Sequence, residues 1–168
     1  MAVSNIEEMF VHDLEDIYYA ENELVDALDE LAEQTDDENA REAFEEHRAE
    51  TEGQIDRLEE VFTQLDMEPD VEECEGIEGL IEEHDTFVSE EDPEQEVLNL
   101  HNLVAAQKTE HYEIAAYENL MEVAEEMEMN DTCDLLEANL EEEQAALEKV
   151  SSLVDEYDFD AEMDQASD

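Results

Sequence analysis

The sequence predicts an all-α protein, a bundle of four long helices with a long crossover that contains a short extra helix. Apolar residues recur at spacings of three and four along four long segments, which is the periodicity of amphipathic helices. No segment alternates apolar and polar side chains as a half-buried strand would. The two prolines, Pro69 and Pro93, bracket one long connection near the middle of the chain. At 168 residues the chain is long enough to bury the core of one domain.

The first two helices are expected to begin at capping boxes, in which a hydroxyl residue precedes a glutamate by three positions. Ser4 with Glu7 and Thr35 with Glu38 have this spacing. They predict helices that begin near residues 5 and 36, and the second helix should end around Asp66. Because the loop between the two helices is short, they should form an antiparallel hairpin.

The second half of the chain predicts one short and two long helices. Residues 76–89 carry apolar side chains at helical spacing, enough for a short helix inside the long connection. Asp92 followed by Pro93 is a favoured pair for the N-cap and first position of a helix, so the third long helix should begin there. The fourth should follow a polar break around Asn130 and Asp131. The long connection would carry this second hairpin across the first, which is the topology of a ferritin-like four-helix bundle.

The composition is very acidic, with 58 Asp and Glu residues against 5 Lys and Arg residues and a formal net charge of -53. At low ionic strength this charge opposes compaction through self-repulsion, whereas at molar salt the Debye length falls to about 3 Å. We therefore expect a protein from a halophile that accumulates salt in its cytoplasm. The chain has no basic patch to release counterions from phosphates, which argues against nucleic acid and anionic membranes as partners and favours metal cations.

Other features of the chain predict a cytoplasmic protein with free thiols. The first residues lack the basic and apolar regions of a signal peptide, and no apolar run approaches the roughly 20 residues that span a bilayer. Cys74 and Cys133 lie far apart without C-x-x-C spacing, which argues against a zinc site or a redox pair. We expect a helical domain over residues 1–154 and an acidic tail over residues 155–168.

Each long helix carries an apolar stripe that polar residues interrupt near its middle. The interruptions are Glu21 in the first helix, His47 and Glu50 in the second, Glu110 and Glu113 in the third, and Glu143 in the fourth. With a rise of about 1.5 Å per residue, the helix lengths bring these positions to one layer of the bundle. Burying several carboxylates together is prohibitive unless some of them protonate or a cation binds them.

We expect this layer to bind two metal ions, with iron favoured and manganese as the alternative. Both ions take hard oxygen ligands with some imidazole, and bridging carboxylates hold two ions close enough to share an oxygen substrate. In a chain this acidic, however, a glutamate can fall on a stripe by composition alone, and a polar layer can fix helix register without metal. Four more polar residues on the stripes would hydrogen-bond the ligands or form an ordinary polar core: Thr51, Gln54, Gln107 and Tyr117. Three histidines lack comparable partners and are expected at the surface or its boundary: His12, His84 and His101.

The chain resembles the YciF-like stress-response proteins of the ferritin-like superfamily from about residue 5 to about residue 150. The strings that carry the resemblance are "HDLEDIYYAENEL", "FEEHRAETEGQIDRLEEVF", "CEGIEGLIEE", "AAQKTEHYEIAAYENL" and "NLEEEQAALEKV". The resemblance implies a homodimer of bundles related to rubrerythrin, with a dinuclear metal site. It places these residues in the family's motifs: Glu21, His47, Glu50, Thr51, Gln54, Glu110, His111, Glu113, Glu142 and Glu143.

The chain departs from rubrerythrin-type sites in its second and fourth helices. Those sites have Glu-x-x-His, whereas here His47 precedes Glu50, and Ala146 stands where the fourth-helix histidine would be. An all-carboxylate set of fourth-helix ligands or a single-metal site therefore stays open. The choice of ligands also stays open between two pairs of residues, Glu142 or Glu143 and His47 or His111.

The resemblance implies a function in stress defence. A di-iron carboxylate site of this kind would oxidise Fe(II) with O2 or peroxide, which is a ferroxidase or peroxidase-like activity. The alternative hypothesis is a non-catalytic dimeric helical scaffold, or a stress-associated binding protein, whose polar core is structural.

Overall fold

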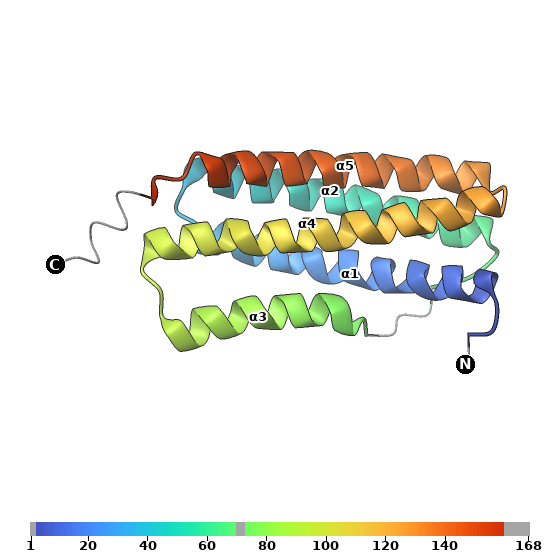
Figure 1. The fold of residues 1–168 in the computed structure, drawn as a ribbon, viewed down its shortest axis with the longest axis horizontal. Helices are drawn as coiled ribbons and strands as arrows, with labels where there is room; N and C mark the ends of the chain where they lie inside the picture. Colours follow the sequence, from blue (N-terminus) through green and yellow to red (C-terminus); the bar gives the residue numbers. More distant parts are fainter. Residues whose placement is uncertain (1–2, 70–72, 160–168) are drawn as a thin grey trace.

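The computed structural model describes residues 3–69 and 73–159 and contains five helices within them. Figure 1 shows α1 (Ile6–Gln34), α2 (Glu38–Gln64), α3 (Glu75–Glu91), α4 (Gln95–Glu126) and α5 (Asn130–Asp155). The described residues contain no strand. The predicted all-α class is therefore confirmed, and the extra helix extends beyond the predicted residues 76–89 at both ends.

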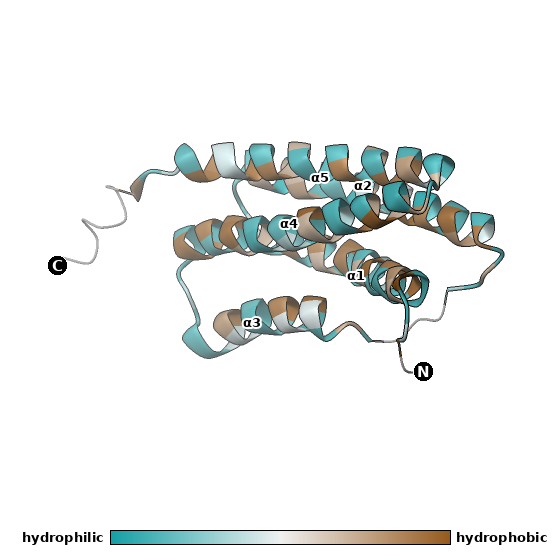
Figure 2. Ribbon diagram, turned by 45° about the vertical axis from the view of Figure 1, so that its right-hand side comes forward, coloured by the Kyte–Doolittle hydropathy of each residue, from teal (hydrophilic) through white to brown (hydrophobic). Residues whose placement is uncertain are grey.

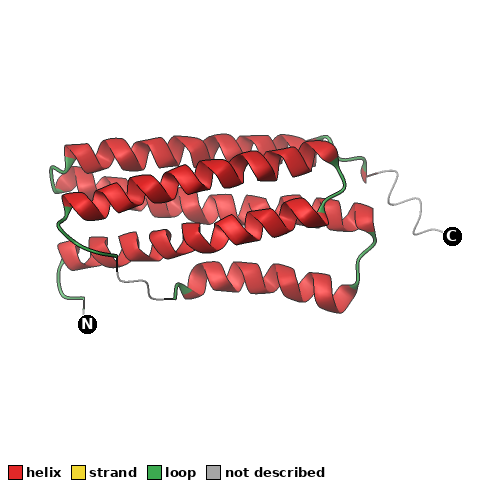
Figure 3. Ribbon diagram, turned by 180° about the vertical axis from the view of Figure 1, so that it is seen from behind, coloured by secondary structure: helices red, strands yellow, loops and turns green. Residues whose placement is uncertain are grey.

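The four long helices form a closed bundle. Helix α1 packs against α2, α2 against α5, α5 against α4, and α4 against α1, while α3 lies outside the bundle on α1 and α4. Tight loops join α1 to α2 and α4 to α5, so each pair is an antiparallel hairpin (Figure 3). Because α3 carries the chain back along the bundle, α2 and α4 run in the same direction. This arrangement confirms the ferritin-like topology.

The first helix begins one residue later than the predicted capping box. The N-cap is Asn5, whose side chain accepts a hydrogen bond from the Glu8 amide at 2.9 Å. The Glu8 carboxylate in turn accepts from the Ser4 amide at 2.8 Å. The pattern resembles a capping box, but Glu8 replaces the predicted Glu7 and accepts from Ser4, the residue before the N-cap, and not from the N-cap itself.

The predicted cap of the second helix is wrong by two residues. Asp37 caps α2 by accepting from the Ala40 amide at 2.8 Å. Thr35 instead ends α1, where its buried hydroxyl donates to the Leu31 carbonyl at 2.7 Å. Because the Thr35 hydroxyl bonds at the buried end of α1, it does not cap α2, and Asp37 caps that helix instead.

The predicted start of the third long helix at Asp92 is also wrong. Helix α3 continues to Glu91, and Asp92 is its C-cap with a left-handed φ of 46°. Short polar residues such as aspartate tolerate this conformation better than most. The next helix therefore begins only at Gln95, after Glu94. The chain leaves α4 and turns at Glu128, which has a φ of 59°. Asn130 and Asp131, predicted as the break between helices, lie instead in the first turn of α5.

The core consists of two apolar clusters with a polar layer between them. Figure 2 shows hydrophilic and hydrophobic residues interspersed along every helix, as expected for amphipathic helices that bury one face. One cluster contains these buried residues, among others: Phe10, Leu14, Ile17, Leu58, Phe62, Tyr117, Leu120 and Leu136. The other contains Leu28, Leu31, Ala32, Ala40, Phe44, Leu103, Ala106 and Val150. On α2, α4 and α5 the predicted polar interruptions fall between the two clusters, whereas on α1 Glu21 lies between Ala20 and Leu24 of the first cluster.

Within residues 3–69 and 73–159, no helix is both long enough and apolar enough to cross a membrane. Cys74 and Cys133 are free thiols, the first buried and the second half-buried, as their spacing predicted. Helix α5 ends at Asp155, which is the first residue of the predicted tail. Most of that tail, residues 160–168, lies outside the described residues.

Candidate metal centre

The polar layer contains a cluster of one histidine and three glutamates from α2, α4 and α5. His47, Glu110, Glu113 and Glu143 are all buried, and each offers one nitrogen or oxygen atom within 4.8 Å of those of the other three. His47 Nε2 lies 3.2 Å from Glu110 Oε1 and 3.4 Å from Glu143 Oε2. The sequence predicted all four as metal ligands, and the fold brings them together.

Glu21 of α1 lies beside this cluster and is fully buried. Its carboxylate accepts a short hydrogen bond from the Tyr117 hydroxyl. The Tyr117 oxygen in turn accepts from Asn139 Nδ2 at 3.0 Å, and the same amide is 3.3 Å from the Gln54 carbonyl. Tyr117 and Asn139 therefore orient the carboxylate that α1 contributes to the layer.

The carboxylates of the layer have far more acceptor capacity than the protein satisfies. Six of their buried oxygens accept no hydrogen bond: Glu21 Oε2, Glu110 Oε2, both of Glu113 and both of Glu143. A buried charge without a partner costs several kcal/mol, so orphaned oxygens on this scale need protons or a cation. Hard oxygen donors with one imidazole are a ligand set that suits iron and manganese. The residues present therefore fit the metal ions that the sequence predicted.

Burial also changes the protonation of these groups. Burial, together with the charge of Glu143, raises the pKa of Glu21 to about 8. Burial likewise raises the pKa of Glu143 to about 8, and that of Glu113 well above its ordinary value. Burial lowers the pKa of His47, but the nearby carboxylates of Glu110, Glu143 and Glu50 outweigh it and raise this pKa well above the usual range. The metal-free layer therefore holds protons at neutral pH that a bound cation would displace.

Three other predicted or alternative ligands lie outside the buried cluster. Glu50 keeps 46% of its side chain exposed, with its Oε2 at 3.2 Å from His47 Nδ1. Glu142 turns away from the layer and forms a bidentate pair with Arg57, at 2.7 and 2.9 Å. His111 is exposed on α4. Of the two open choices, Glu143 and His47 are thus the residues that face the layer.

The four polar residues expected around the ligands divide into two groups. Thr51 and Tyr117 act near them, since Thr51 donates to the His47 carbonyl at 2.9 Å. Gln54 is fully buried, and neither amide atom of its side chain has a hydrogen-bond partner. Gln107 bonds instead to the Ser151 hydroxyl at 3.1 Å.

Sequence reasoning missed three buried polar residues, Asn102, Thr132 and Asn139, and misplaced a histidine. Asn139 lies three residues after Leu136 and four before Glu143. The inward-facing stripe of α5 could therefore have included Asn139 in place of Leu140. His84 is buried, although it was expected at the surface or its boundary. Its Nε2 lies 2.8 Å from Asn102 Oδ1, because α3 covers this part of α4.

Comparisons with known proteins support a single family over nearly the whole chain. The family described as "Domain of unknown function (DUF892)" matches residues 5–161. The protein YciF of Escherichia coli (strain K12) is 39% identical over 154 residues, which cover 91% of this chain and 92% of YciF.

Two solved structures resemble this fold closely. YcfI from Rhodopseudomonas palustris, described as a candidate structural protein, superposes with a TM-score of 0.86 at 38% identity and covers 89% of this chain and 94% of its own. The E. coli stress protein YciF superposes with a TM-score of 0.85 at 38% identity and covers 90% of this chain and 96% of its own. This chain is therefore similar to both proteins in amino-acid sequence as well as in the arrangement of its helices.

Proposed function

This chain belongs to the YciF-like family described as DUF892, and we propose that it is a stress-response protein that binds two divalent metal ions, iron or alternatively manganese, in its polar layer. The six buried carboxylate oxygens without a hydrogen bond carry this proposal. Apolar residues of similar size would avoid the cost of burying these groups, so their presence at the centre of the bundle favours a ligand. The stress role is taken from the description of the E. coli relative.

The residues of the layer divide between two metal positions. His47, Glu110, Glu113 and Glu143 would hold one ion, because their ligand atoms already lie within 4.8 Å of one another. Glu21, which lies close enough to feel the charge of Glu143, would help to hold the second ion together with Glu113 and Glu143. Shared carboxylates are the usual way in which a helical bundle holds two ions side by side.

Two Fe(II) ions bound side by side would supply the two electrons that reduce peroxide to water, or would reduce O2. The chain contributes an environment shielded from bulk water over most of its surroundings, because apolar clusters pack beside the layer. The Tyr117 hydroxyl holds the Glu21 carboxylate by a hydrogen bond, and Asn139 holds the tyrosine.

The direct test is the metal content of the purified protein after anaerobic loading with Fe(II) and extensive washing at high salt. We expect about two equivalents per chain, the number that a dinuclear carboxylate site binds. Peroxide should then oxidise the bound Fe(II), which absorbance in the near ultraviolet follows. No bound iron after loading would contradict the proposal. Metal that scales with surface charge and washes out in salt would indicate nonspecific binding to the acidic surface instead.

The stability of the metal-free protein should fall as pH rises between 4.5 and about 8. Glu143 has an ordinary pKa of 4.5 when unfolded and one of about 8 when folded, so the folded state binds more protons in this interval. Repulsion between surface carboxylates also lowers stability as pH rises. The Glu143→Gln variant separates the two effects, because it removes the buried titrating group and keeps the surface charges. Urea unfolding across this pH range should give a shallower slope for the variant, and parallel curves would contradict the assigned pKa.

The description of YcfI favours a second function, that of a non-catalytic scaffold. In that case the polar layer only fixes helix register, and the metal measurement described above separates the two functions. The homodimer implied by the family resemblance stays a prediction in both cases. Sedimentation equilibrium of the protein at high salt tests it.

A further inference from the structure

Two openings lead from the surface to the polar layer, and they differ in chemistry. One lies between α2 and α5, has a volume of about 180 Å³, and is bordered by exposed Glu46 and Glu50 with the small residues Ala145 and Ala146. The other lies under α3, between α1 and α4, and has a volume of about 40 Å³. It is lined mainly by apolar side chains, which include Leu24, Leu28, Leu80, Ile81 and Ala105. Figure 1 shows α5 beside α2, and α3 on the other side of α4.

His47 stands between the outside and the inside of the first opening. Its Nδ1 lies 3.2 Å from Oε2 of the half-exposed Glu50, and its Nε2 lies 3.2 Å from Oε1 of the buried Glu110. Glu110 also lines this opening, and its Oε2 is buried without a hydrogen bond. One imidazole ring thus connects an exposed carboxylate with an orphaned buried one.

We propose that the opening between α2 and α5 is the entrance for divalent cations, where Glu50 takes the ion first and His47 passes it to Glu110. This inference rests on the proposed metal binding and explains why Glu50 lies outside the buried cluster. A cation that gives up water must find oxygen or nitrogen ligands at every step. Exposed Glu50, the His47 ring and buried Glu110 supply such a series.

The opening under α3 is the narrower of the two, with a volume of about 40 Å³ against about 180 Å³. Glu30 and Asp85 also line it, but Leu24, Leu28, Leu80 and Ile81 surround the path, so a cation that still carries water finds less room and more apolar surface there. The opening between α2 and α5 contains one lysine or arginine among its lining residues, Lys149. The adjacent Glu46 and Glu50 outnumber this charge, so the mouth remains attractive to cations.

Stopped-flow mixing with Co(II) tests the entrance, because cobalt ligation gives a visible absorption band without any redox step. The measurement uses the whole protein at one KCl concentration at which circular dichroism shows every variant folded. Ala145→Phe, at the mouth, should lose the fast binding phase while the final cobalt content stays unchanged. Glu50→Gln should slow binding by about tenfold, the lower range of rate effects from charged clefts, again without changing the final content.

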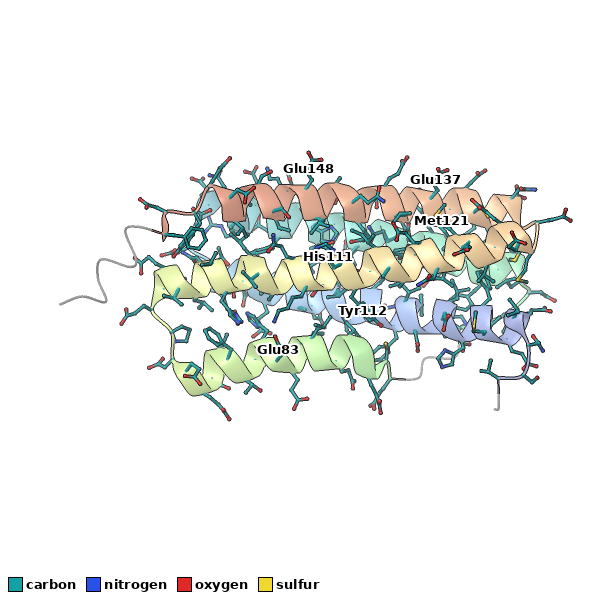
Figure 4. All side chains as sticks on the ribbon, viewed as in Figure 1. Glu83, His111, Tyr112, Met121, Glu137 and Glu148 are labelled. Atoms are coloured by element: carbon teal, nitrogen blue, oxygen red, sulfur yellow. The ribbon has the colours of Figure 1, made fainter. Side chains whose placement is uncertain are left out.

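Two further variants serve as comparisons. Glu148→Phe places the same side chain on the outer face of α5, where Figure 4 shows Glu148 pointing away from the bundle, and should leave the rate unchanged. Ala105→Phe fills the opening under α3 and should also leave the rate of cobalt binding unchanged. A wild-type rate in Ala145→Phe, or slow binding in Ala105→Phe alone, would overturn the proposed entrance. A reduced final content in Glu50→Gln would overturn its role as a transfer ligand. Wild-type protein that binds no cobalt would instead contradict the metal site itself.

Discussion

Replacement of Glu113 by glutamine should abolish tight metal binding and yet stabilise the metal-free protein. Both carboxylate oxygens of Glu113 are buried without a hydrogen bond, and burial raises its pKa well above the ordinary value. In the unfolded chain this carboxyl ionises in water, so at pH 7 folding must either bury the charge or take up a proton, at a cost of about 3 kcal/mol. Glutamine has the same shape and avoids this cost.

The same change removes an anionic carboxylate that would bind metal. Loss of residues that merely orient ligands costs 10- to 100-fold in metal affinity, so loss of a ligand itself should cost more than about a hundredfold. Calorimetric titration with Mn(II) or Co(II) measures the affinity, and urea unfolding with and without metal measures stability. Metal should stabilise the wild type by mass action and have no such effect on Glu113→Gln.

Glu118→Gln provides the matched control, because Glu118 is exposed on the same helix, α4. It removes one negative charge from the chain, as Glu113→Gln does, but leaves the polar layer intact. We expect wild-type metal binding and a change in unfolding free energy below about 0.5 kcal/mol, as for most surface substitutions. Equal effects of the two substitutions would mean that net charge, and not the buried layer, governs metal binding.

Transfer to low salt should unfold the protein. The chain carries a formal net charge of -53, and exposed glutamates cover the outer faces of the helices, as Glu137 and Glu148 on α5 illustrate in Figure 4. Between 1 M and 10 mM salt the Debye length grows from about 3 Å to about 30 Å, so repulsion that was local extends across the whole bundle. Circular dichroism during dilution from KCl should show a cooperative loss of helix.

Two controls separate screening from other actions of salt. Sucrose strengthens apolar burial without screening charge, so it should replace KCl only poorly. The double variant Glu137→Lys/Glu148→Lys reduces repulsion on the exposed face of α5 and should shift the unfolding midpoint to lower KCl. A midpoint that does not move would argue against charge repulsion as the cause. The halophilic origin stays a prediction, and the expected loss of helix at low salt would support it.

Helix ends were the least predictable part of the fold. Ser4 and Thr35 match the capping pattern, yet Asn5 and Asp37 form the caps. Asp92 looks like the start of a helix and instead ends one. Several residues near each helix end have suitable side chains, and their energies differ by only about 1 kcal/mol, so packing of the adjoining helices selects among them.

The choice between neighbouring ligands likewise depended on packing. Glu142 and Glu143 are separated by about 100° around α5, and the α5 stripe alone allows either to face inward. Arg57 on α2 binds Glu142 and leaves Glu143 to the layer. The outward position of Glu50, beside the inward His47, follows from the same geometry on α2.

The sequence by itself determined the all-α class, the two hairpins with their crossover, and the level at which polar residues interrupt the core. Those features depend on periodicity and on rise per residue, which are properties of each helix alone. Only the tertiary structure decided that His47 and three glutamates converge, that Glu21 is held by Tyr117, and that two chemically different openings reach the layer. Convergence and openings depend on how helices rotate and pack against one another, and local sequence patterns do not specify that rotation.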